Sequence, residues 1–175
     1  QIGDGTTISK SSLVRVVDGI KTISAGAYQT VVLKTDNSLW ACGDNEYGQA
    51  ASLSGNEFVA VSAGTAHSLA LKKDGTIVGW GLNDSEQNIP EGNDFKAVAA
   101  SYSHSLALKN DGTIVGWGNP YCLEGLPDGN DFIAISSSGY HSLALRKNGT
   151  IAAWGDSANA WGQLDVPDSN DFKAI

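Results

Sequence analysis

Three histidines are the residues of this sequence whose type and spacing most directly suggest chemistry. His67, His104 and His141 lie 37 residues apart, and each begins the same phrase, "HSLAL". Three imidazoles can bind one metal ion only if every ring nitrogen lies about 2.1 Å from it. Equivalent positions in neighbouring repeat units lie too far apart for that, so we expect no metal and no cofactor. We interpret the histidines as structural, each tying a strand to a loop inside its own unit, because buried polar groups need partners.

Three tryptophans recur with the same period. Trp80, Trp117 and Trp154 each come near the end of a strand and beside glycine. We predict that they pack between repeat units, because a buried aromatic side chain removes a large apolar area from water. Trp161 follows another pattern, since it lies in "DSANAWGQ", a loop insertion of the last unit with no apolar periodicity. It is therefore a candidate exposed contact residue.

The elements that position these residues are β-hairpins. In "HSLALKNDGTIVGWG", residues 104–118, apolar and polar residues alternate around Asp111-Gly112. An Asp-Gly or Asn-Gly pair between two such strands predicts a tight type I′ turn, in which glycine supplies the positive φ angle. Another strand precedes each hairpin, as in "FKAVAAS" from Phe95. No segment keeps a helical period, so the sequence predicts an all-β protein.

The chain is a single repeat domain over residues 1–175. Its full units are residues 20–57, 58–94, 95–131 and 132–171, and residues 1–19 and 172–175 are partial repeats. The first full unit has diverged, with Gln29 in the histidine place and Cys42 in the tryptophan place. A period near 37 residues with three or four strands is the size of one β-propeller blade. Such sheets bury their faces only by covering one another.

The loops that follow the third strand of each unit differ in sequence, unlike the strands. They supply a first set of candidate protein-binding residues: Glu46, Tyr47, Asp84, Glu86, Tyr121, Asp156 and Trp161. A second aromatic set lies on the turns before the glutamine or histidine positions: Tyr28, Tyr102 and Tyr140. Aromatic anchors surrounded by polar residues are typical of protein interfaces. We expect at least one of the two sets to form a binding surface.

Composition and motifs exclude several classes of function. A net charge of −8 opposes binding to nucleic acid, which needs clustered Lys and Arg. The sequence has no apolar run long enough to predict insertion into a membrane. It has no nucleophile elbow, zinc-protease motif or phosphate loop, so we expect no enzyme activity. Cys42 and Cys122 fall about two units apart, too far for a disulfide, and we expect both to be free thiols.

Several stretches resemble the repeats of the regulator of chromosome condensation family. The resemblance is carried by "ISAGAYQTVVLKTDNSLWACGDNEYGQ" and "AGTAHSLALKKDGTIVGWG", and it recurs in every unit. It implies blades of a β-propeller that has seven blades in the family. Four full repeats and two partial ones then predict a fragment, an open arc or part of a seven-bladed ring. Self-association of chains is one way to close such a ring.

The resemblance and the loop residues together predict a non-enzymatic scaffold that binds another protein. The repeated stretches are similar to those of bacterial members of the family, including the propeller-type β-lactamase inhibitor protein. This similarity favours an extracellular or cell-surface setting. Inhibition of a β-lactamase is therefore one alternative, and a structural repeat region of a larger surface protein is another. Guanine nucleotide exchange, the activity of the founding member, is a weaker alternative because the negative charge opposes chromatin binding.

Overall fold

Four antiparallel sheets of three strands each make up the fold. The computed structural model describes residues 16–82, 88–156 and 160–175, and it confirms the all-β prediction. The strands are β1 (Ile20–Ala25), β2 (Gln29–Lys34), β3 (Leu39–Gly43), β4 (Phe58–Ala63), β5 (His67–Lys72), β6 (Ile77–Gly81), β7 (Phe95–Ala100), β8 (His104–Lys109), β9 (Ile114–Gly118), β10 (Phe132–Ser138), β11 (His141–Arg146) and β12 (Ile151–Gly155). One short 3-10 helix, η1 (Pro120–Leu123), occupies a loop for which the sequence predicted no helix.

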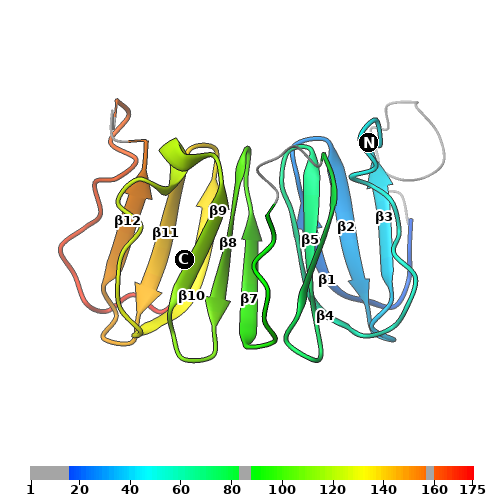
Figure 1. Cartoon of the computed structure of the whole chain (residues 1–175), viewed down its shortest axis with the longest axis horizontal. Helices are drawn as coiled ribbons and strands as arrows, with labels where there is room; N and C mark the ends of the chain where they lie inside the picture. The colour runs from blue at the N-terminus through cyan, green and yellow to red at the C-terminus, as the bar shows by residue number, and fades with distance from the viewer. Residues whose placement is uncertain (1–15, 83–87, 157–159) are drawn as a thin grey trace.

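The sheets stand side by side in a row, with β1–β3 at one end and β10–β12 at the other (Figure 1). Within each sheet the second strand is central and pairs with both neighbours. The first strand of each later sheet packs against the first and second strands of the sheet before it. Among the described residues the row is open, which is consistent with a fragment, an open arc or part of a larger ring.

The apolar core lies between successive sheets. Side chains alternate across a strand, so Leu69 and Leu71 of β5 share the face turned to the next sheet. They meet Phe95, Ala107 and Trp117, which belong to that next sheet. The following junction repeats the arrangement with the equivalent side chains, Leu106 and Leu108 against Phe132, Ala144 and Trp154. The unit of stability is therefore a pair of adjacent sheets.

The recurrent histidines join one sheet to the next. His67 Nε2 lies 2.9 Å from Ser105 Oγ, and His104 Nε2 lies 2.8 Å from Ser142 Oγ. For His104, whose other ring nitrogen has no partner among the described residues, the prediction of a tie between a strand and a loop of the same unit is therefore wrong. His67 lies on the same face of β5 as Leu69 and Leu71, so its ring points away from its own sheet and toward the next one. Gln29 does the same work at the first junction, where Nε2 donates to the carbonyls of Gly64 and His67.

The hairpin turns differ from the type I′ turn that the sequence predicted. Lys72 N donates to Thr76 O, and Gly75 N donates to Lys72 O, so the loop has three residues. Gly75 has a φ of +83°, whereas Asp74 is not among the residues with positive φ. This is a type I turn closed by a glycine in the left-handed region, and a type I′ turn needs two residues there. The carboxylate of Asp74 accepts hydrogen bonds from Thr76 N and Oγ1, which braces the turn.

Glycine is required in this turn for a second reason. A Cβ on Gly75 would lie 2.1 Å from the carbonyl oxygen of Asn93, in the loop that leads to the next unit. The same close approach occurs at Gly112 and Gly149, which face the carbonyl oxygens of Asn130 and Asn170. Each hairpin turn is therefore packed against the start of the following unit.

Candidate protein-binding face

Both predicted aromatic sets lie at one end of the sheets. This end, where second strands begin and third strands end, is at the top of Figure 1, and the hairpin turns are at the bottom. Its exposed aromatic side chains range from 49% exposure at Tyr47 to 92% at Trp161. We call this end the aromatic face, defined by Tyr28, Tyr47, Tyr102, Tyr121, Tyr140 and Trp161. The two sets are neighbours because, in an antiparallel pair, one strand starts where its partner stops.

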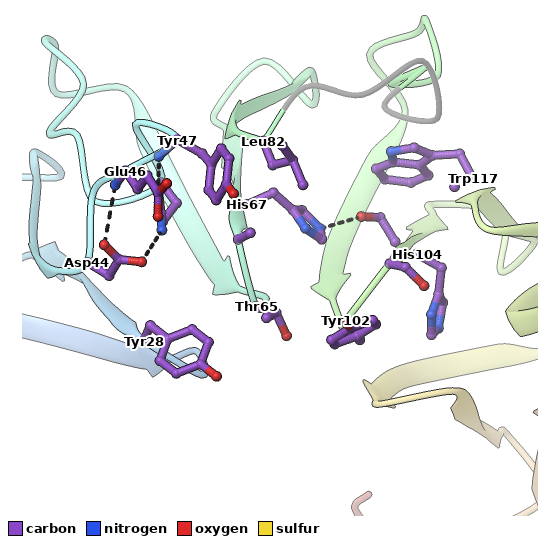
Figure 2. Close-up of a pocket in the computed structure, with 15 residues that line it drawn as sticks. Tyr28, Asp44, Glu46, Tyr47, Thr65, His67, Leu82, Tyr102, His104 and Trp117 are labelled. Atoms are coloured by element: carbon purple, nitrogen blue, oxygen red, sulfur yellow. Dashed lines mark hydrogen bonds between the residues drawn. The ribbon is translucent and has the colours of Figure 1, made fainter.

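A hollow of about 430 Å³ opens on the aromatic face between the first three units. Tyr28, Tyr47 and Tyr102 line it from three different segments, as Figure 2 shows. Its other lining residues include Leu82 and the mostly buried Trp117. The structure thus brings one tyrosine of the loop set together with two from the turn set.

One wall of the hollow is a braced loop. Asp44 accepts hydrogen bonds from Glu46 N through Oδ1 and from Gln49 Nε2 through Oδ2, at 3.3 and 3.0 Å. Gln49 Oε1 in turn accepts from Tyr47 N at 2.9 Å. Gln49 itself is only 1% exposed, so it anchors the loop from inside. Tyr47 and Asp44 are therefore held in place before any partner arrives.

The same brace recurs in the fourth unit. Gln163 Oε1 accepts from Trp161 N at 3.1 Å, and a glycine with positive φ separates the two residues, as in Tyr47-Gly48-Gln49. Both stretches read aromatic-Gly-Gln in the sequence, but the bracing role of the glutamine was not predicted from it. Tyr121 is presented differently, from η1, where Asn119 Oδ1 accepts from Tyr121 N.

The remaining predicted residues are spread along the face. The rings of Tyr102 and Tyr140 lie 5.4 Å apart, so Tyr140 adjoins the hollow through Tyr102. Tyr121, Asp156 and Trp161 do not line the hollow. Asp84 and Glu86 lie outside the described residues.

Charge divides the two ends of the sheets. Nine of the eleven Lys and Arg residues fall in the described part, and all of these lie at the hairpin-turn end: Lys21, Lys34, Lys72, Lys73, Lys96, Lys109, Arg146, Lys147 and Lys173. The described ion pairs are there too, joining Lys72 to Glu57, Lys109 to Asp94 and Arg146 to Asp131. The aromatic face carries acidic side chains instead, among them Asp44, Glu46 and Glu124. It therefore presents negative charge beside aromatic rings.

The histidine–serine contacts have the spacing of a base beside a nucleophile. Ser142, however, is fully buried, and burial, followed by the neighbouring His67 and His141, lowers the pKa of His104 to about 4. Within the described chain, His104 Nδ1 has no hydrogen-bond partner, so no carboxylate orients the ring as in a catalytic triad. The pair is repeated at successive junctions, which fits a structural bond.

Comparison with known proteins agrees with this geometry. The sequence profile of the Regulator of chromosome condensation (RCC1) repeat matches residues 20–49, 58–87, 95–122 and 132–162. The chain belongs to the RCC1 repeat family. A search of curated proteins finds no significant match.

Solved RCC1-like structures share the blade fold at low sequence identity. The chain is 20% identical to Prp20p from Saccharomyces cerevisiae, with a TM-score of 0.64 over 78% of this chain and 45% of that one. The structure of Prp20 bound to Kap60 gives 19% identity and a TM-score of 0.68 over 88% of this chain and 47% of that one. The receptor kinase CR4 ectodomain of Physcomitrella patens is 22% identical to this chain, with a TM-score of 0.67 over 78% of this chain and 40% of that one. The chain thus spans less than half the length of these structures, and its sheets are RCC1-type β-propeller blades.

The tryptophans that recur in the repeats of this chain lie mostly inside. Trp117 and Trp154 are buried between sheets, and Trp80 is half-buried. Cys42 and Cys122 form no disulfide. Across residues 16–82, 88–156 and 160–175, no three His, Cys, Asp or Glu side chains are grouped to hold a metal. In the same ranges no helix has the length and apolarity to cross a bilayer.

Proposed function

We propose that this chain is a non-enzymatic scaffold that binds another protein through its aromatic face. One observation carries the proposal: tyrosines from three segments surround a preformed hollow at the end of the sheets that has acidic and no basic side chains among the described residues. Protein interfaces are enriched in tyrosine and tryptophan, which contribute large contact areas with few torsions to immobilise. The brace around Gln49 lowers the ordering cost further.

The absence of enzyme activity is part of the proposal. The histidine–serine pairs are buried structural bonds, and they recur at successive junctions. The structure of Prp20p was reported together with its binding to Gsp1p and histones, and Prp20 was solved bound to Kap60. Those partners belong to that protein. Here a protein partner is inferred from the aromatic face itself.

The proposal is tested by capture with matched variants. The wild-type chain, a face variant (Tyr28→Ser, Tyr47→Ser, Tyr102→Ser) and a control variant (Lys73→Ser, Asn110→Ser, Lys147→Ser) are immobilised and exposed to extract. The control changes three exposed residues at the hairpin-turn end. We expect a protein retained by wild type and control but not by the face variant. Calorimetry on the purified pair should show at least 100-fold weaker binding to the face variant.

Two results would reject the proposal: equal retention by all three proteins, or loss with the control variant alone. Nitrocefin turnover by a class A β-lactamase supplies a further arm. Inhibition by the wild-type chain that the face variant lacks would make a β-lactamase the partner.

A further inference from the structure

We propose that the hollow between the first three units binds an arginine side chain of the partner protein. The guanidinium would stack on the tyrosine rings and pair with the acidic wall formed by Asp44 and Glu46. This inference rests on the proposed function, because it takes the aromatic face as the contact surface. It adds the chemical class of the group that enters.

The shape of the hollow fits a long side chain with a flat end. Its volume of about 430 Å³ far exceeds the space for single waters. Tyr28, Tyr47 and Tyr102 offer ring faces on which a planar guanidinium stacks, whereas the ammonium of lysine is compact and strongly hydrated. Leu82 and Trp117 supply apolar surface for the methylene stem.

Charge favours a cation. Asp44 accepts hydrogen bonds only from neutral donors in the described contacts, the amide of Glu46 and the side-chain amide of Gln49. The described ion pairs all lie at the hairpin-turn end, so they leave the acidic wall uncompensated. A carboxylate beside aromatic rings binds an arginine more strongly than either group does alone, because both interactions act on the same planar cation.

The test uses a library of random 12-residue peptides displayed on phage and selected on the immobilised wild-type chain. We expect the selected peptides to share an arginine. Replacing that arginine with citrulline, which keeps the shape and removes the charge, should weaken binding about tenfold on the wild type. On the Glu46→Gln variant the same replacement should weaken binding much less. Glu46 is exposed, so this variant keeps the fold. Asp74→Asn, at the hairpin-turn end, is the matched control and should behave as wild type.

The outcomes separate this inference from the proposed function. Selected peptides without a shared arginine, or an equal citrulline effect on wild type and Glu46→Gln, would overturn the arginine site. If such peptides still lose binding to the Tyr28→Ser and Tyr47→Ser variants, the proposed protein-binding face is supported without the arginine site. Peptides that bind all variants equally, or no selected peptide at all, would overturn both.

Discussion

The hairpin-turn end and the aromatic face of these sheets follow opposite rules. At the hairpin-turn end all four units use the same device: Asp36, Asp74, Asp111 and Asn148 each accept from the amide and hydroxyl of a serine or threonine two residues later. These bonds lower the pKa of the Asp74 and Asp111 carboxyl groups. On the aromatic face the loops differ in sequence: Tyr47 and Trp161 lie in aromatic-Gly-Gln stretches, whereas Tyr121 is presented from η1. The repeated end builds the fold, and the varied end is free to bind.

The largest expected effect separates two tryptophans seven positions apart. Trp154 is 2% exposed in the core, whereas Trp161 is 92% exposed on the aromatic face. Trp154→Ala should lower the free energy of unfolding by about 3–5 kcal/mol, because it leaves a cavity between sheets. Trp161→Ala should change it by about 0.5 kcal/mol or less. Urea unfolding followed by circular dichroism measures both. Similar losses for the two variants would erase the distinction between the ends.

Glycine substitutions give the next largest effect. Gly75 and Gly48 share nearly the same φ, +83° and +82°, but a Cβ on Gly48 meets nothing within 4 Å. Gly75→Ala should cost about 2–4 kcal/mol, from backbone strain and the clash with the Asn93 carbonyl. Gly48→Ala adds backbone strain without a clash, so it should lower the free energy of unfolding by about 1 kcal/mol. Thermal unfolding of the two variants compares the tightly packed end with the open one. If Gly48→Ala lost as much stability as Gly75→Ala, backbone strain alone would account for both losses and the clash with Asn93 would contribute nothing.

Acid sensitivity should come from the junctions between sheets. The pKa of His104 is lowered from 6.5 to about 4 in the folded chain, with burial as the main cause. The unfolded chain therefore binds the proton first as pH falls, and stability that is complete above pH 6.5 is lost toward pH 4. This residue should contribute about 3 kcal/mol to the difference in unfolding free energy between pH 7 and pH 4.

His104→Gln supplies the comparison for that pH dependence, since Gln29 already holds this place in the first unit. The variant should lose less stability between pH 7 and pH 4 than the wild type. Urea unfolding at the two pH values measures the difference, and the carboxylates common to both proteins cancel. Equal losses in both proteins would mean that His104 is not the acid-sensitive group.

The smallest effect on stability is expected on the aromatic face itself. Tyr28→Ser and Tyr47→Ser remove exposed side chains, so each should alter the free energy of unfolding by about 0.5 kcal/mol or less. Both should nevertheless weaken partner binding, which calorimetry records on the same samples. A face variant that loses stability and binding in proportion would show that its tyrosines support the fold instead.

The repeat itself made most of the fold predictable. The 37-residue spacing of His67, His104 and His141 predicted where the strands lie, and the resemblance of the repeated stretches predicted the family. The serine partners of His67 and His104 were not predictable, because they lie in the next unit and depend on which way the strand faces. The turn type was wrong because Asp-Gly also suits a three-residue loop.

The candidate site could be predicted only in its parts. The sequence named Tyr28, Tyr47 and Tyr102 but assigned them to two sets, since their meeting depends on how three sheets stack. The role of Gln49 was missed, because a buried glutamine bracing an aromatic residue leaves no periodic signal. A second aromatic-Gly-Gln stretch at Trp161 was the only hint of it.

Each loop of the aromatic face is bounded by two fixed points. It starts after a third strand that ends in glycine, and it ends at a phenylalanine whose amide donates to the preceding hairpin turn, at Phe58, Phe95, Phe132 and Phe172. Between these points the loops hold 13 to 16 residues, yet each sheet keeps three antiparallel strands in the same order, and β10 is only one residue longer than the other first strands. The tip of each loop can therefore vary, while its two anchors and its core contacts, made by Leu53, Ile89 and Leu123 in the first three units, keep the frame unaltered.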